Sequence, residues 1–120
     1  MRFDPVAALI AYHDAINRLD FEAIETMFAE DALYVSPGFG GETRGRAAIL
    51  KAFRDYFARF PDQHAKDDLV EQLGDRSVRS VWRLEATDRT TGEVIRRNGE
   101  EVTDFDDAGR IVRVTVFDRG

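Results

Sequence analysis

The 120-residue chain contains no cysteine, which excludes disulfides, thiolate metal sites and a cysteine nucleophile. It also lacks an excess of positive charge, since its formal net charge is −6. Nucleic acids and anionic membranes recruit an excess of Lys and Arg, so we expect neither as the main partner. No stretch has the apolar run of a signal peptide or of a membrane-spanning segment. We therefore expect a soluble cytoplasmic protein.

The order of the apolar residues predicts a single α+β domain over residues 1–120, with three helices in its first half. Asp4-Pro5 can begin the first helix, because Asp caps free N–H groups and Pro is tolerated in the first turn. The second helix follows Asp20, and the third, which is the most clearly amphipathic, follows Gly45. The stripe of the first helix comprises Val6, Leu9, Ile10, His13 and Ile16, with Tyr12 and Leu19 at its edge. That of the second comprises Phe21, Ile24, Met27 and Phe28.

Alternating apolar and polar residues predict that the second half of the chain is a sheet. A short strand over residues 32–35 precedes the third helix, and Ser36-Pro37 ends it, since Pro cannot donate to a sheet ladder. Further strands are expected near residues 63–73, 78–86, 94–105 and 110–118, with turns at 90–93 and 106–109. A long antiparallel meander curls, and helices that cover its concave face leave a cone-shaped hollow.

Three short motifs carry a resemblance to a known family. They are Leu19-Asp20 followed by Ile24, Phe28-Ala29 and Asp31-Ala32; Gly45-Arg46 followed by Ala48-Ile49; and the segment from Asp107 to Val112. In these motifs and their order the chain resembles the nuclear transport factor two-like superfamily, and within it the SnoaL-like and ketosteroid-isomerase-like proteins. The resemblance implies a cone-shaped barrel in which a curved, mainly antiparallel sheet wraps around three helices. It leaves the function open, because this architecture hosts isomerases, cyclases and binding modules.

The same resemblance points to Tyr12 and Glu101 as catalytic candidates. In ketosteroid isomerases a tyrosine of the first helix and an acid on a late strand donate hydrogen bonds to a substrate oxygen, forming an oxyanion hole. Tyr12 and Glu101 fall at the matching places. The alternatives are that Tyr12 packs at the edge of the core and that Glu101 belongs to a solvated charge run over residues 96–101. The catalytic base of that family is replaced by Ser36, so the family's steroid isomerisation is not expected.

Two further titratable residues are candidates for acid–base chemistry. His13 lies within the apolar stripe of the first helix, and is either a hydrogen-bonded core residue or an acid or base that faces the hollow. Asp118 shares a face of the last strand with Val114 and Val116, although it could equally be a terminal charge at the strand's end. The series His64-x-x-Asp67-Asp68 matches no metal motif, so we expect no metal and no cofactor.

These candidates lead to a functional hypothesis. We expect the hollow to bind a small, mostly apolar molecule, and if it is catalytic, to perform isomerase-, cyclase- or lyase-like chemistry with Tyr12, His13 and either Glu101 or Asp118. The alternative is a non-catalytic ligand-binding or dimerisation domain. The resemblance also implies a homodimer that packs through the outer sheet face, where we expect Val81, Val102 and Ile111. The residues expected to contact the ligand are Ser36, Phe39, Phe53, Phe57, Trp82, Thr103 and Val116.

Overall fold

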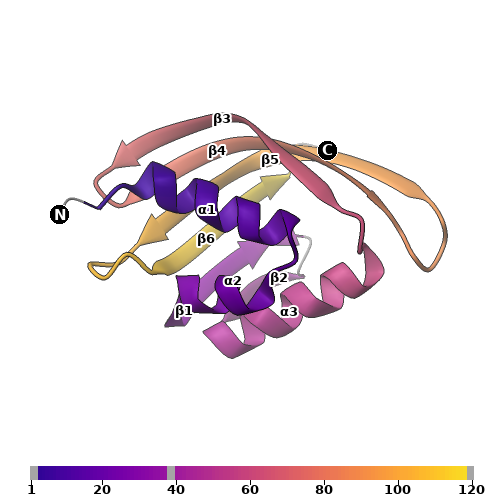
Figure 1. Cartoon of the computed structure of the whole chain (residues 1–120), viewed down its shortest axis with the longest axis horizontal. Coiled ribbons are helices and arrows are strands. Elements are labelled where there is room, and N and C mark those ends of the chain that lie inside the picture. Colours follow the sequence, from indigo (N-terminus) through magenta and orange to yellow (C-terminus); the bar gives the residue numbers. More distant parts are fainter. Residues whose placement is uncertain (1–2, 38–39, 119–120) are drawn as a thin grey trace.

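Three helices pack against one face of a single six-stranded sheet (Figure 1). The computed structural model describes residues 3–37 and 40–118. The helices are α1 (Pro5–Asn17), α2 (Phe21–Met27) and α3 (Arg46–Arg59). The strands are β1 (Phe28–Ser36), β2 (Gly41–Arg44), β3 (His64–Gly74), β4 (Ser77–Thr87), β5 (Val94–Phe105) and β6 (Ile111–Asp118). The predicted α+β fold is confirmed.

The sheet is mixed and strongly bent. Its strand order is β2-β1-β6-β5-β4-β3, in which β1 and β6 are parallel and all other neighbours are antiparallel. The long strands β3, β4 and β5 arch over the helices in Figure 1, and α1 runs along their concave side. The curl expected of a twisted antiparallel sheet therefore encloses the space in which a ligand site can form.

Four details of the first half differ from the sequence-based expectation. Strand β2 was missed, because its four residues lie in a glycine-rich segment and become a strand only by pairing with β1. Phe28 begins β1 instead of ending α2, and β1 is longer than expected. Ile10 is 53% exposed, whereas Tyr12, expected at the edge of the stripe, has no exposed surface. The buried positions of α1 are Pro5, Leu9, Tyr12 and Ala15.

Polar anchors fix the helices that surround the concave face. The Asp4 carboxylate caps α1 by accepting hydrogen bonds from the backbone N–H groups of Val6 and Ala7, both at 3.1 Å. The Arg59 guanidinium at the end of α3 donates to the buried Asp88 carboxylate from Nε at 2.9 Å and from Nη2 at 2.7 Å. Because Asp88 begins the turn between β4 and β5, this pair ties α3 to the far end of the sheet.

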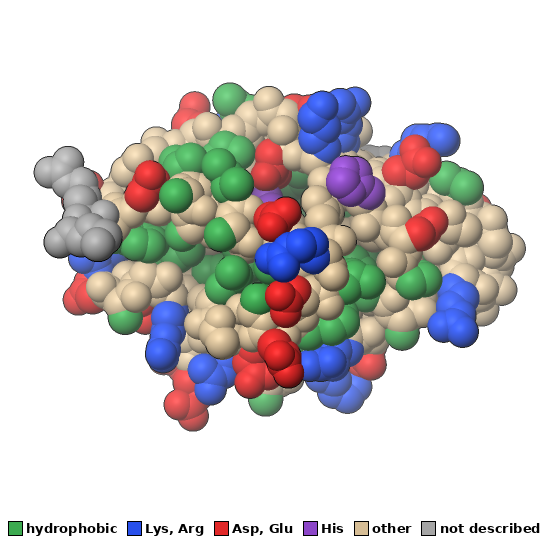
Figure 2. Space-filling view, viewed as in Figure 1, with side chains coloured by type: hydrophobic (Ala, Val, Ile, Leu, Met, Phe, Trp, Pro, Cys, Tyr) green, Lys and Arg blue, Asp and Glu red, His purple; other side chains and the backbone are tan. Residues whose placement is uncertain are grey.

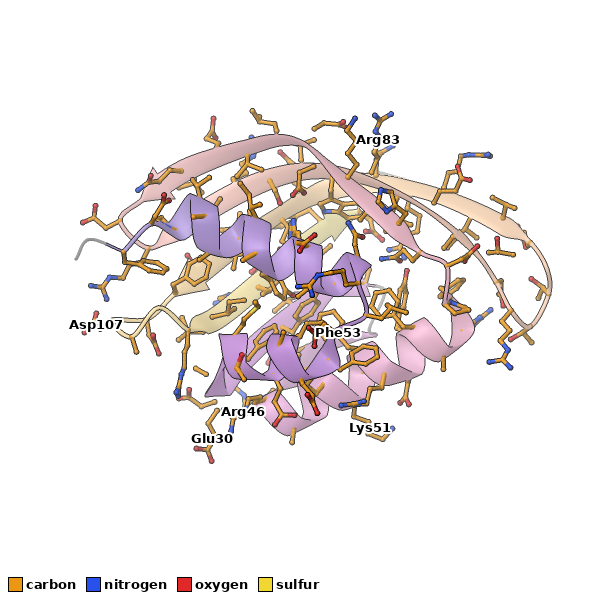
Figure 3. The ribbon with its side chains drawn as sticks, viewed as in Figure 1. Glu30, Arg46, Lys51, Phe53, Arg83 and Asp107 are labelled. Atoms are coloured by element: carbon orange, nitrogen blue, oxygen red, sulfur yellow. The ribbon has the colours of Figure 1, made fainter. Side chains whose placement is uncertain are left out.

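Side chains that face the space between the helices and the sheet differ in character from those that point outward. In Figure 3, Phe53 points between the helices and the sheet, whereas Lys51 and Arg83 point outward. Ile111, expected on the outer face, is 1% exposed and belongs to the core, because a register shift between Asp104 and Phe105 turns it inward. On the face shown in Figure 2, acidic and basic side chains are interspersed, so that face presents no large patch of one sign.

Candidate functional site

A cavity of about 100 Å³ lies between the helices and the concave face of the sheet. At roughly 10–15 Å³ for each water position, it has room for several water molecules or one small organic molecule. Its wall is mostly aromatic and aliphatic, which suits a ligand with a large apolar part. The apolar lining residues are Ile16, Tyr34, Phe53, Tyr56, Phe57, Ala65, Trp82, Leu84 and Val116. The polar ones are His13, Ser36, Gln63, Asp67, Arg97, Glu101 and Asp118.

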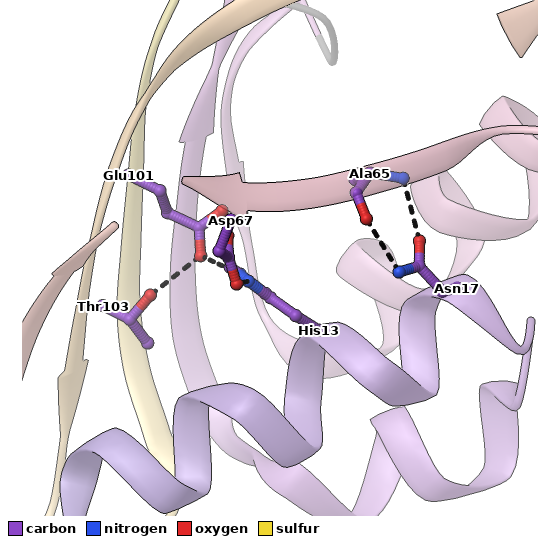
Figure 4. Close-up of polar contacts among 6 residues, drawn as sticks. All are labelled: His13, Asn17, Ala65, Asp67, Glu101 and Thr103. Atoms are coloured by element: carbon purple, nitrogen blue, oxygen red, sulfur yellow. Dashed lines mark hydrogen bonds and ion pairs between the residues drawn. The ribbon is translucent and has the colours of Figure 1, made fainter. Parts of the chain in front are cut away.

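One group of polar side chains, which we call the inner cluster, is centred on His13 and includes Asp67, Glu101 and Thr103 (Figure 4). The imidazole lies between two carboxylates, with 2.7 Å from Nδ1 to Oδ2 of Asp67 and 3.0 Å from Nε2 to Oε1 of Glu101. The Thr103 hydroxyl donates to the same Glu101 oxygen at 2.9 Å. The side chains of His13, Asp67 and Glu101 are only 17%, 19% and 8% exposed.

The position of His13 follows from how α1 is attached to β3. One turn after His13, the Asn17 side chain forms two hydrogen bonds with the backbone of Ala65, at 2.9 and 3.0 Å (Figure 4). Residues four apart share a face of a helix, so this attachment directs His13 toward β3 as well. There it meets Asp67, which shares a face of β3 with Ala65. The rotational setting of α1 thus places the imidazole among the carboxylates.

The electrostatics of the inner cluster keep His13 charged at neutral pH. Burial alone would lower the pKa of this imidazole, but the charge of Glu101 and the hydrogen bonds to Asp67 and Glu101 outweigh that effect and raise the pKa to about 10. Both ring nitrogens therefore carry protons and donate to carboxylates. A protonated imidazole cannot accept a proton, so the groups of this cluster that could act as a base on a ligand are the carboxylates of Asp67 and Glu101, of which Glu101 is the more deeply buried.

Two tyrosines lie close to Glu101, at different depths. Burial, followed by the charges of neighbouring groups that include Glu101, raises the pKa of both phenols well above its usual value. Tyr12 is fully buried and lies outside the cavity wall, whereas Tyr34 lines the cavity. Of these two phenols, the one at the cavity wall is therefore that of Tyr34, which was not among the site residues predicted from the sequence.

A second group of polar side chains, the outer cluster, comprises Tyr56, Gln63, Arg97 and Asp118. Arg97 forms an ion pair with Asp118, and the Tyr56 hydroxyl donates to the Gln63 side-chain oxygen. Burial raises the pKa of the Tyr56 phenol and Arg97 opposes this rise, so the guanidinium also interacts with Tyr56. Arg97 and Asp118 have side chains that are 25% and 24% exposed, which places this cluster nearer to solvent than Glu101.

The structure brings most of the expected site residues to one cavity. Among them, Tyr12 and Thr103 lie behind the wall, and Phe39 falls outside the described residues. Those that line the cavity are His13, Ser36, Phe53, Phe57, Trp82, Glu101, Val116 and Asp118. Tyr34, Asp67 and Arg97 also line the cavity, although the sequence did not predict them as site residues. Asp67 could have been found from its alternation with Ala65, but a register shift in β3 directly after Asp67 obscures that pattern.

The chain has the nuclear transport factor two-like fold, with its cavity between the helices and the sheet. Within that class, the chain belongs to the family of SnoaL-like domains, whose pattern matches residues 9–114. No curated protein matches the chain in sequence. None of the described helices is long and apolar enough to cross a membrane. Among the described residues, no group of three or more His, Cys, Asp or Glu side chains is arranged to hold a metal ion.

Solved structures with the same fold differ in what they do. A Δ5-3-ketosteroid isomerase from Mycobacterium sp. is 19% identical, with a TM-score of 0.82 over 94% of this chain and 91% of its own. A Mycobacterium tuberculosis protein in complex with estradiol-17β-hemisuccinate is 13% identical, with a TM-score of 0.83 over 94% and 92%. The epoxide hydrolase/cyclase-like enzyme SalBIII, which takes part in pyran ring formation in salinomycin, is 22% identical, with a TM-score of 0.82 over 93% and 88%. At these identities the likeness shows the fold alone.

Proposed function

We propose that this protein binds a small, mostly apolar molecule with a carbonyl or hydroxyl group, and that Glu101 performs proton transfer on that molecule. The observation that carries the proposal is the His13 imidazolium held between Asp67 and Glu101 at the wall of a mostly apolar cavity. Ionisable groups with strongly shifted pKa values, gathered in a concave apolar site, are typical of catalytic centres. The known ligands and reactions of structures with this fold, which include a steroid complex, an isomerase and a cyclase-like enzyme, agree with such a site.

The geometry suggests separate roles for these residues. Oε1 of Glu101 accepts from both His13 and Thr103, whereas Oε2 makes no hydrogen bond among the described residues. Oε2 is therefore the oxygen that can take a proton from an acidic carbon of the ligand and return it to another position, a shift that needs no cofactor. The Tyr34 hydroxyl, at the cavity wall, can donate to the ligand oxygen on which negative charge develops. His13 acts through Glu101 and is a positioning residue.

Hydrogen–deuterium exchange tests the proton-transfer step without knowledge of the product. Progesterone, an apolar enone with exchangeable hydrogens beside its carbonyl, is incubated with the protein in D2O and its deuterium content is followed by mass spectrometry. We expect exchange well above the uncatalysed rate, and a loss of at least about 100-fold in Glu101→Gln, which removes the base. Asp31→Asn, a change at an exposed carboxylate on β1, is the matched control. Equal exchange by the parent and Glu101→Gln would contradict the role of Glu101.

A second function is favoured by one observation. Ser36 lines the cavity at the position where related isomerases carry their aspartate base, and a serine cannot replace it near neutral pH. The alternative is therefore a non-catalytic ligand-binding protein. Estradiol, a steroid without the enone, distinguishes the two. If it raises the melting temperature while progesterone shows no protein-dependent exchange, the cavity binds without turnover.

The Tyr34 hydroxyl should contribute to binding. Tyr34→Phe is expected to weaken estradiol about five- to tenfold, the worth of roughly 1 kcal/mol for one hydrogen bond. Tyr12→Phe is the comparison variant, because Tyr12 is a neighbouring buried tyrosine that lies outside the cavity wall. Isothermal titration calorimetry of both variants measures the difference. An equal loss in the two variants would show that the effect is transmitted through the core and does not come from a contact with the ligand.

We also infer a homodimer through the outer sheet face. Strand register places Leu69, Val81, Glu100 and Phe117 in one row across β3, β4, β5 and β6, and Leu69 and Phe117 are 47% and 51% exposed. Val81 and Val102 are half-buried on this face, as expected from the sequence. Three of the four residues in the row are apolar, and exposed apolar residues that cluster on a sheet are typical of a contact surface between subunits. The molar mass in solution by light scattering decides between a monomer and a dimer.

A further inference from the structure

On the side of β5 that faces the cavity, a polar residue is followed by a glycine and then by a second polar residue. Arg97, Gly99 and Glu101 alternate on this side, and Arg97 and Glu101 both line the cavity. Residues four apart on a strand are separated by roughly 13 Å, at about 3.3 Å per residue. Arg97 belongs to the outer cluster and Glu101 to the inner cluster, so one strand places two polar groups at a fixed separation.

The stretch between these two groups is flat and apolar. Gly99 faces Trp82 across the β4–β5 pair, and a Cβ atom on Gly99 would lie 2.7 Å from Cζ2 of Trp82. The indole therefore packs directly on the β5 backbone, and only a glycine leaves room for it. Trp82, which is level with Gly99, then forms an apolar surface between the clusters, and Val116 lies opposite Glu101 on β6. A ligand that spans the cavity meets hydrogen-bonding groups at its ends and apolar surface in its middle.

The outer cluster is better suited to an anion than to a cation. The Arg97 guanidinium carries five N–H donors, of which its ion pair with Asp118 uses those on Nη2, and the acceptor oxygens of the cluster belong to Tyr56, Gln63 and Asp118. One of these acceptors, in Gln63, is already taken by Tyr56, and Asp118 is paired with Arg97. The planar fork of an arginine also matches the two oxygens of a carboxylate. The guanidinium N–H groups that Asp118 does not use can therefore donate to a ligand carboxylate that reaches Arg97.

We propose that the ligand of this cavity is an elongated apolar molecule with a phenol or carbonyl oxygen at the inner cluster and a carboxylate at the outer cluster. The carboxylate pairs with Arg97 and competes with Asp118 for it. This proposal rests on the proposed function, since it concerns the same cavity, and it specifies the class of ligand. We therefore expect that the preference for a negatively charged ligand over a neutral one depends on Arg97. Competition from Asp118 should weaken this preference.

The test compares ligands that differ only in charge. The probes are 4-hydroxyphenylalkanoic acids of increasing chain length, their methyl esters and the corresponding amines, each titrated by calorimetry near neutral pH. At the best chain length we expect the acid to bind about tenfold more tightly than its ester, because charge-assisted hydrogen bonds are roughly twice as strong as neutral ones. Arg97→Gln should remove this preference, Arg97→Lys should keep part of it, and Asp118→Asn should enlarge it.

Arg96→Gln is the matched control, because Arg96 is exposed and pairs with Glu85 on the other side of β5. It should bind acid and ester in the ratio seen for the parent protein. Equal affinities for acid and ester in the parent, an unchanged ratio in Arg97→Gln, or tighter binding of the amine would overturn this inference while leaving the proposed function intact. Failure of every acid, ester and amine to bind would overturn both.

Discussion

Gly99→Ala is expected to lower the free energy of unfolding by about 3 kcal/mol or more, although alanine is normally the better strand residue. An added Cβ would clash with the backbone oxygen of Phe117 and with Cζ2 of Trp82, 2.7 Å away. The first contact lies in the β5–β6 ladder and the second is a ring packed in the cavity wall, so neither can move freely. Urea unfolding followed by circular dichroism measures the loss.

Gly74→Ala provides the matched control. Gly74 ends β3, and no atom lies within 4 Å of the position that its Cβ would occupy. Its substitution should change stability by less than about 0.5 kcal/mol, as surface changes usually do. If the variant at Gly99 is folded well enough to be titrated, its affinity for estradiol should also fall, because Trp82 is displaced toward the cavity. A variant at Gly99 as stable as the one at Gly74 would contradict the close packing described for Trp82.

Much of the fold was predictable because it depends on local signals. Asp4-Pro5 fixes the start of α1, and strict alternation fixes the inward side of β4, where Val78, Ser80, Trp82 and Ala86 are buried. Such patterns reflect the geometry of one element and need no knowledge of its neighbours. Strand β2 and the inward turn of Ile111 were missed for the opposite reason. Each exists only through pairing or a register shift between strands distant in sequence.

The residues of the candidate site also fall into those that a local pattern predicts and those that depend on a partner distant in the sequence. Apolar wall residues such as Phe53 and Trp82 were selected from periodicity, and both line the cavity. Glu101 was harder to place, because it follows a run of polar residues that resembles a solvated surface. A carboxylate can be buried at moderate cost only when a partner is present, and its partner, His13, lies 88 residues away in the sequence. Asp67 was considered only as part of a series without a metal motif, because its role is defined by its contact with the distant His13 imidazole.

Raising the pH from 6.5 toward 10 is expected to reduce the stability contributed by His13, by on the order of a few kcal/mol in total. The folded-state pKa is raised from 6.5 to about 10, so the folded protein holds this proton more tightly than the unfolded chain. The contribution is therefore complete below pH 6.5 and is lost as the pH rises to about 10. Discharge of the imidazole would leave Asp67 and Glu101 side by side without a positive charge between them.

Urea unfolding at a series of pH values measures this dependence as a difference from His13→Gln. Subtracting the free energy of unfolding of His13→Gln from that of the parent protein removes the contribution of tyrosines and lysines, which titrate in both proteins. The chain has only one other histidine, His64, which is exposed, so His64→Gln should retain the dependence of the parent protein. If His13→Gln loses stability with pH as steeply as the parent, the imidazole is not held as a cation, and Glu101 would lack the charged partner on which its proposed role depends.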